Sequence, residues 1–243
     1  MSRPAVAAQT RIELMMTLRR GESLLVTLVI PLGILVFFSK VDPVQDSTAT
    51  SIEFLVPGVL ALAVMSTAMV SLGIATGFER RYGVLKRLGS TPLSRAGLLT
   101  AKTGNVLVIE LLQAVLIIGT GTLLGWEINA GILPALVLLL IGTVAFAGIG
   151  MLMAGTLRAE ANLAAANGLF LVLLFLGGMA YPLDRLPDAL ELVAKALPAA
   201  ALSECVRGVL ASPATLPAGE LLVLLVWAVG APLAAIRFFR WEE

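Results

Sequence analysis

Long apolar runs alternate with short polar segments along this chain. Six of the runs have the roughly 17 to 25 residues that an α-helix needs to cross a bilayer. The pattern predicts transmembrane spans at about 22 to 39, 54 to 78, 103 to 125, 132 to 156, 161 to 181 and 218 to 238. We therefore expect an all-α integral membrane protein whose six transmembrane helices form one domain over residues 22 to 238.

The composition is that of a protein whose apolar surface lies in a lipid bilayer. Mean hydropathy is +0.97, and only 14% of the residues are charged. A water-soluble fold of 243 residues could not bury that much apolar surface. Arginine outnumbers lysine, and alanine, leucine, glycine and valine dominate, which is typical of a GC-rich bacterial genome. We expect a multi-pass protein of the bacterial cytoplasmic (inner) membrane, and the net charge of +1 gives no support to nucleic-acid binding.

The distribution of basic residues predicts the orientation. Six spans place both termini on the same side of the membrane. If that side is the cytoplasm, thirteen of the 17 lysine and arginine residues lie inside and four lie outside. Cytoplasmic loops carry such an excess. We predict that the N- and C-termini are both cytoplasmic.

A helix is also expected before the first span. Residues 5 to 18 mix apolar and charged positions as a mildly amphipathic helix does. Such a helix can lie along the inner leaflet. We predict an interfacial helix in residues 1 to 21, with a frayed tail as the alternative.

The outer segment from 182 to 216 is too apolar for an ordinary loop. Leu186, Leu190, Val193 and Leu197 recur at helical spacing, and a second apolar stretch runs from 199 to 210. We predict a re-entrant helical hairpin that dips into the outer leaflet.

Most catalytic chemistry is excluded by residues that the sequence lacks. It has no histidine and one cysteine, Cys205, so it holds neither a histidine-based metal site nor an internal disulfide. It contains no GxxxxGK[ST] phosphate-binding run. We expect no enzyme activity and no metal in this chain, and we interpret Cys205 as a small buried side chain.

The predicted cytoplasmic loop from 79 to 102 is rich in basic residues: Arg80, Arg81, Lys86, Arg87, Arg95 and Lys102. Its pattern predicts a helix that stops at Gly89 and a second helix with Thr91 as N-cap and Pro92 as first residue. A short helix would then cross the membrane surface. Two interpretations stay open: a docking surface for another protein, or a solvated turn whose cations mark topology and contact lipid phosphates.

The third span contains a carboxyl group, Glu110, and an amide, Gln113. A carboxyl group at membrane depth costs on the order of 3 kcal/mol, so Glu110 should face protein or water together with Gln113. Glu110 is either protonated and hydrogen-bonded to a neighbouring helix, or it is a proton or substrate site.

The second span holds candidates for a substrate path. Met65 and Met69 lie one turn apart with Ser66 nearby, and flexible methionines suit varied substrates. Pro57 and Gly58 open the same span and can cap or kink it. Core packing is the alternative interpretation for all of these residues.

Five segments stand in a distinctive order along the chain: Phe54-Leu55-Val56-Pro57-Gly58, Glu79-Arg80-Arg81-Tyr82-Gly83-Val84-Leu85-Lys86-Arg87-Leu88, Thr91-Pro92-Leu93-Ser94, Gly177-Gly178-Met179 and the run from Glu204 to Gly208. Together they resemble the permease subunits of ABC-2 type exporters, most closely the daunorubicin-resistance-type branch that exports drugs or lipids. The resemblance covers essentially the whole chain, and Gly83-Val84 departs from it because many relatives have Gly-Thr there.

The resemblance implies a type V ABC exporter fold and a separate ABC ATPase subunit. Two ATPase subunits would bind ATP and Mg and drive two permease chains, a homodimer or a close heterodimer, while this chain binds no cofactor. The loop's short helix would couple the subunits, and we expect this ATPase contact to use Glu79, Arg80, Arg81, Tyr82, Gly83, Lys86 and Arg87.

The expected substrate is a hydrophobic drug or a lipid-like molecule, as in multidrug efflux and antibiotic resistance. Outer loops are short and aromatics make up only 6% of the chain, which disfavours a polysaccharide. The alternative function is a proton-coupled secondary transporter that uses Glu110. Such transporters need ionisable residues at the midplane and often have internal repeats, and the sequence offers Glu110 alone and no obvious repeat.

Overall fold

The computed structural model describes residues 3–19, 21–40, 52–91, 93–128, 131–179, 182–211 and 213–242. All regular structure in these residues is helical. The elements are α1 (Arg3–Arg19), α2 (Gly21–Lys40), α3 (Ile52–Val64), the π-helix η2 (Met65–Ser71), α4 (Leu72–Arg81), α5 (Val84–Gly89), α6 (Arg95–Leu123), α7 (Ile132–Thr156), α8 (Ala159–Leu176), the 3₁₀ turn η3 (Leu183–Arg185), α9 (Asp188–Lys195), α10 (Pro198–Leu210) and α11 (Ala218–Phe238).

Five helices in the described residues are long and apolar enough to cross a membrane, and a shorter apolar helix, Thr27–Lys40, lies within α2. This confirms the predicted all-α membrane fold. The second span is one continuous helix, Ile52–Arg81, built from α3, η2 and α4. The five long helices are Ile52–Arg81, Arg95–Leu123, Ile132–Thr156, Ala159–Leu176 and Ala218–Phe238.

The predicted bounds of two helices agree with those in the structure. Helices α7 and α11 have the predicted bounds, 132 to 156 and 218 to 238. Helix α6 begins at Arg95, three residues after the predicted start at Pro92, because Ser94 is its N-cap and accepts a hydrogen bond from the Gly97 amide at 3.0 Å. The predicted N-cap at Thr91 is therefore wrong, and Pro92 lies outside the described residues.

Helix α7 forms the centre of the bundle and packs on α11, α4, α10 and η2. Its glycines allow the backbones to approach closely. A Cβ atom on Gly148 would lie 2.5 Å from the Pro232 nitrogen of α11, and one on Gly150 would lie 2.6 Å from the Met69 carbonyl oxygen of η2. The small residues that the sequence places in this span are therefore contact points between helices.

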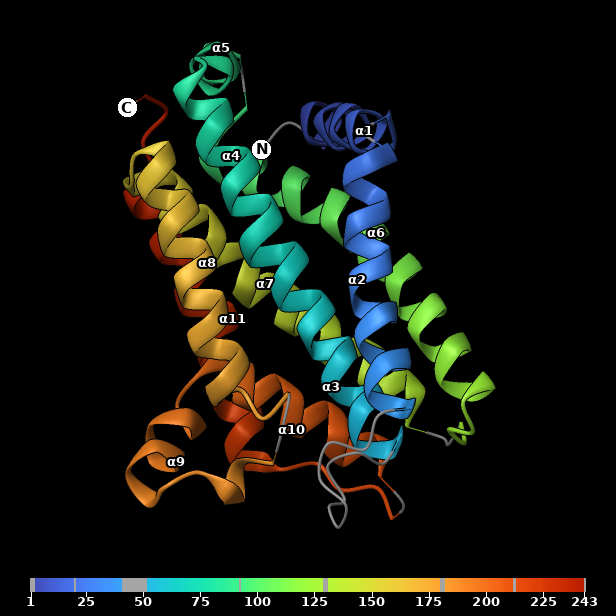
Figure 1. Ribbon diagram of the computed structural model, residues 1–243. Helices are drawn as coiled ribbons and strands as arrows, with labels where there is room; N and C mark the ends of the chain where they lie inside the picture. Colours follow the sequence, from blue (N-terminus) through green and yellow to red (C-terminus); the bar gives the residue numbers. More distant parts are fainter. Residues whose placement is uncertain are drawn as a thin grey trace.

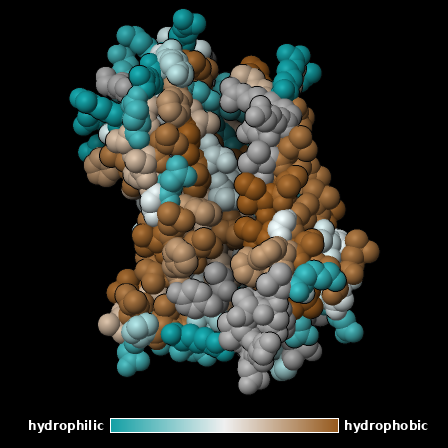
Figure 2. Space-filling view, viewed as in Figure 1, coloured by the Kyte–Doolittle hydropathy of each residue, from teal (hydrophilic) through white to brown (hydrophobic). Residues whose placement is uncertain are grey.

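The bundle has two different ends (Figure 1). We call them the α5 end, which also carries α1 and the C-terminus, and the α9 end, where α10 lies across the bundle. Hydrophilic residues gather at both ends, and a hydrophobic band lies between them (Figure 2). This banding fits a chain that spans a bilayer.

The segments expected to be helical outside the spans are indeed helical. Helix α1 covers most of residues 1 to 21 and packs mainly against α6, and its position at a membrane surface stays a prediction. Helices α9 and α10 occupy the predicted hairpin, and its depth in the outer leaflet also stays a prediction. Cys205 of α10 is fully buried with a free thiol, as interpreted from the sequence.

Candidate functional site

The α5 end carries a projecting tip, which we define as residues 82 to 89. Helix α4 ends at Arg81, and Gly83 then adopts a left-handed conformation with φ 71°. Glycine has no Cβ atom to oppose this conformation, so the chain turns there and the short helix α5 starts. The predicted stop at Gly89 is confirmed as the end of α5.

The tip is anchored to the bundle on one side and exposed on the other. Leu85 is fully buried, and Gly89 packs against the Trp241 ring, which lies 3.2 Å from where a Cβ atom would be. Tyr82 is 71% exposed, and Lys86 and Arg87 are exposed as well. The tip is therefore fixed to the core through Leu85.

Two arginine side chains directly before the tip bind other parts of the chain. Arg80 is only 4% exposed, and its Nη2 donates to the Leu157 carbonyl oxygen at the end of α7, at 2.6 Å. Arg81 forms an ion pair with Glu160 of α8. In this structure Arg80 thus connects α4 to the end of α7, although the sequence suggested that it contacts another protein.

The remaining basic residues of the 79 to 102 loop have separate environments. Lys86 Nζ lies 3.3 Å from Glu242 Oε2 near the C-terminus, and both side chains are exposed. Arg87 and Arg95 are exposed, with Arg95 in the first turn of α6. Lys102 is 1% exposed, so it contacts neither lipid phosphate nor solvent.

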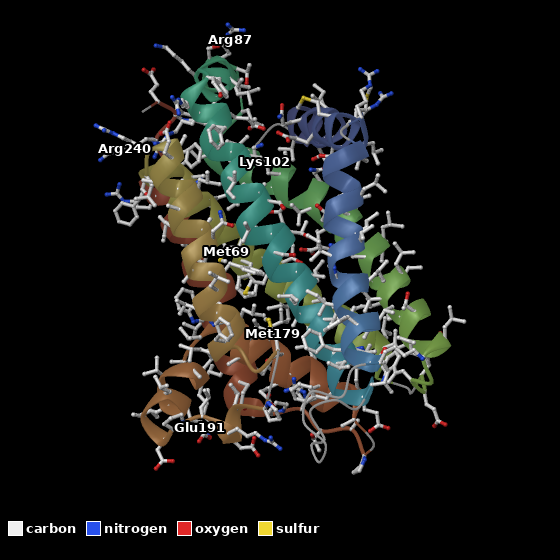
Figure 3. The ribbon with its side chains drawn as sticks, in the orientation of Figure 1. Met69, Arg87, Lys102, Met179, Glu191 and Arg240 are labelled. Atoms are coloured by element: carbon white, nitrogen blue, oxygen red, sulfur yellow. The ribbon has the colours of Figure 1, made fainter. Side chains whose placement is uncertain are left out.

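Lys102 joins three helices through two carboxylates. Its Nζ lies 2.9 Å from Glu13 Oε1 of α1 and 2.7 Å from Glu79 Oε2 of α4. Gln9 Nε2 also donates to Glu13 Oε1, at 2.8 Å. We call Gln9, Glu13, Glu79 and Lys102 the Lys102 clamp; Figure 3 labels Lys102 where these helices meet. The clamp links α1 to the helix that leads to the tip.

A cavity of about 120 Å³ lies beside the clamp between α1, α2, η2, α4 and α6. Asn105 Nδ2 donates to Thr17 Oγ1 at 3.1 Å on its wall. The wall is rich in polar groups. The polar lining residues are Glu13, Thr17, Thr27, Thr67, Ser71, Glu79, Lys102 and Asn105.

The π-helix η2 presents hydroxyls to this cavity. Thr67 and Ser71 line the cavity, and Thr67 Oγ1 donates to Gln113 Oε1 at 3.2 Å. Gln113 Nε2 donates in turn to the Thr27 carbonyl oxygen at 3.0 Å, so Gln113 does face the bundle. π-Helices occur frequently at functional sites. Thr67 and Ser71 were not among the predicted site residues, although two hydroxyl groups at helical spacing in an apolar span were a usable signal.

The suggested substrate-path methionines lie on the other side of η2. Met65 and Met69 are fully buried, and the backbone of Met69, which is labelled in Figure 3, packs against Gly150 of α7. Ser66 Oγ donates to the Ala63 carbonyl oxygen of its own helix at 3.0 Å. The burial of the two methionines fits the core-packing interpretation, and a role of these residues in a substrate path stays a prediction.

Gly58 packs against Met179 at the α9 end, and Pro57 next to it is buried in α3. A Cβ atom on Gly58 would lie 2.6 Å from the Met179 carbonyl oxygen, so glycine permits this approach. The Arg207 guanidinium lies 4.0 Å from the centroid of the Phe54 ring and donates to the Gly178 carbonyl oxygen at 2.7 Å. Three segments that are distant in the sequence, beginning at 54, 177 and 204, thus converge at one place.

Glu110 is buried in α6 and contacts a neighbouring helix. It is 7% exposed, and its Oε2 accepts a hydrogen bond from the Thr143 hydroxyl of α7. This geometry matches the first of the two interpretations, in which Glu110 bonds to a neighbouring helix.

Comparisons with known proteins agree with this architecture. A family described as "ABC-2 type transporter" matches residues 5–211. The chain is also 25% identical over 200 residues to the "Putative transport permease YvfS" of Bacillus subtilis (strain 168), a match that covers 78% of this chain and 79% of that protein. With most of its length matched, this multi-pass membrane chain belongs to the ABC-2 type transporter family.

Proposed function

We propose that this permease works as the membrane subunit of an ATP-driven exporter that moves a hydrophobic drug or a lipid-like molecule. A separate ATPase subunit hydrolyses ATP with Mg, and two permease chains pair with two such subunits. The observation that carries the proposal is the α5 end, where a tip with an exposed face is anchored in the core. We assign this end to the cytoplasm.

The coupling contact is narrower than the sequence suggested. Of the residues that the sequence suggested for the ATPase contact, three lie on the tip with exposed side chains: Tyr82, Lys86 and Arg87. These three side chains contact the ATPase subunit. Gly83 shapes the turn before α5. A compact patch with one aromatic and two cationic side chains suits an interface hot spot, since tyrosine and arginine are enriched there.

The remaining predicted coupling residues transmit force within the chain. Glu79 connects α4 to Lys102 of α6, and Arg80 connects it to the end of α7. Helix α8 is tied to α4 as well, because Asn162 Nδ2 donates to the Gly73 carbonyl oxygen at 2.8 Å. A push on the tip therefore reaches α6, α7 and α8 together.

The test uses membrane vesicles that contain the permease and its ATPase subunit. Replacing Tyr82 and Arg87 with alanine should reduce ATP-dependent export at least tenfold, while folding and insertion stay unchanged. Arg95→Ala is the matched control, because Arg95 is an exposed cation of the same loop that lies outside the tip. Full export by the double variant, with unchanged co-purification of the ATPase subunit, would refute the proposed contact.

A further inference from the structure

A second cavity, of about 280 Å³, lies between α3, α6 and α7. This volume is slightly below the range of small-molecule pockets, which is roughly 300 to 1,000 Å³. Its walls are apolar apart from Glu110, Gln113 and Thr143. Glu110 and Thr143 have no part in the coupling path described above.

The hydrogen bonds of these three side chains leave one oxygen without a partner. Gln113 uses its oxygen for Thr67 and its nitrogen for Thr27. The Thr143 hydroxyl contacts both Glu110 Oε2 and the Leu139 carbonyl oxygen. In the described residues Glu110 Oε1 is buried and has no hydrogen-bond partner. Native proteins rarely leave a buried polar atom unpaired, so this oxygen calls for an explanation.

The unpaired oxygen can be an acceptor or a donor, depending on protonation. If Glu110 is ionised or is protonated on Oε2, Oε1 is an acceptor and its missing partner is an N–H or O–H group. If Glu110 is protonated on Oε1, that oxygen is itself a donor. A hydroxyl group can supply the missing partner in each of these states.

The cavity faces the hydrophobic surface of the bundle. Its walls include Leu111, which is 59% exposed, and Leu140, which is 48% exposed. Both belong to the apolar band that a bilayer would cover. A ligand can therefore reach the cavity sideways from lipid, between α6 and α7, without crossing an aqueous compartment.

We propose that this cavity binds an amphiphile from the bilayer. Its apolar chain lies against the walls formed by α3, α6 and α7. Its head group, a hydroxyl or an amine, donates a hydrogen bond to Glu110 Oε1, which is buried in the structure and must turn toward the ligand. That this amphiphile is also the exported substrate rests on the proposed function, whereas its binding does not.

The test is photolabelling of membranes that contain the full chain with its ATPase partner, without added ATP. The probes are a long-chain alcohol with a diazirine in its chain and the methyl ether of the same molecule, which cannot donate a hydrogen bond. The alcohol should label the cavity walls about three- to tenfold more than the ether, as one net hydrogen bond implies. Peptide mapping should place the label on α6 and α7 near Leu111 and Leu140.

Two variants distinguish the hydrogen bond to the head group from the shape of the cavity. Glu110→Met keeps the side-chain length but removes the acceptor, and alcohol labelling should fall to the ether level. Ala114→Leu fills the cavity, since Ala114 is a buried wall residue, and should reduce labelling by both probes. The control is Gly119→Leu on the same helix, where a Cβ atom meets nothing within 4 Å; it should change neither.

Equal labelling by alcohol and ether in the unchanged chain would overturn the inference, because an ordinary lipid tail would then explain the occupancy. Probe-independent cross-links between two copies through α6 and α7 would also overturn it, since a second chain would cover the cavity. Full ATP-dependent export with no label in the cavity would refute this site and leave the proposed function intact. A labelled cavity without ATP-dependent export would refute the function and leave the site intact.

Discussion

Lys102 and Glu79 form an ion pair inside the protein, with Lys102 Nζ 2.7 Å from Glu79 Oε2. Glu79 is close to the end of α4, directly before the tip, and Lys102 lies in the second turn of α6. Glu13 of α1 completes the contact on the other side. The N-terminal helix is therefore tied by charge to the two helices that flank the 79 to 102 loop.

Removing the lysine should destabilise the α5 end. Lys102→Met leaves two carboxylates without their cation, and breaking a buried ion pair in this way costs about 3 to 5 kcal/mol. Thermal unfolding in detergent should show the loss. Lys86→Met is the control, because its pair with Glu242 is exposed and such pairs contribute only about 0 to 1 kcal/mol.

A double variant tests whether the cost comes from the uncompensated charge. Adding Glu79→Gln to Lys102→Met should restore part of the lost stability, since one buried carboxylate disappears. Strictly additive losses would contradict the clamp.

Gly150→Ala should separate α7 from η2. The new Cβ atom would lie 2.6 Å from the Met69 carbonyl oxygen, a backbone atom that cannot rotate away. Overpacking of this kind costs about 1 to 3 kcal/mol. Gly168→Ala is the matched control on α8, where a Cβ atom meets nothing within 4 Å. A melting temperature for Gly150→Ala equal to that of the control would show that the two helices do not pack as described.

Arg207→Met should loosen the α9 end. The variant loses the hydrogen bond to the Gly178 carbonyl oxygen and the contact with the Phe54 ring. Hydrogen bonds from charged groups contribute about 1.5 to 3 kcal/mol, so a comparable loss is expected. Limited proteolysis of the 177 to 187 segment would detect it, with the exposed Arg185→Met as control.

Glu110→Gln tests the alternative of a proton-coupled transporter. The amide keeps an acceptor oxygen and can still bond to Thr143, so ATP-driven export should be unchanged at every pH where the ATPase works. Transport assays with and without a collapsed proton gradient measure this. Export that disappears with the gradient, and that Glu110→Gln abolishes, would support the alternative instead.

The sequence predicted the helices well because their signals are local. Helix α11 starts directly after Pro217, and α7 is an unbroken apolar run that starts after Gly131. The start of α6 was harder, since Thr91-Pro92 and Ser94 are competing helix starts and the hydrogen bond to Gly97 decides between them. The sequence pattern alone does not show which of two possible N-cap residues the helix uses.

The roles of the charged residues could not be predicted in the same way. Lys102 and Arg80 belong to a basic cluster in the sequence, yet their partners, Glu13 and Leu157, lie far along the chain. Only the packing of α1 and α7 against this end reveals that these two cations are internal. The composition identifies the loop as basic. The tertiary structure is needed to show which of its cations bind other parts of the chain and which are exposed on the tip.

The central claim is that the exposed face of the tip contacts the ATPase subunit, and site-directed photo-crosslinking tests it most directly. A photo-reactive amino acid at Tyr82 or Arg87 should form an adduct with the ATPase subunit in membranes. The same amino acid at Val172, an exposed position on α8 in the hydrophobic band, should form none. Absence of adducts from Tyr82 and Arg87 in a complex that still co-purifies and transports would contradict the account.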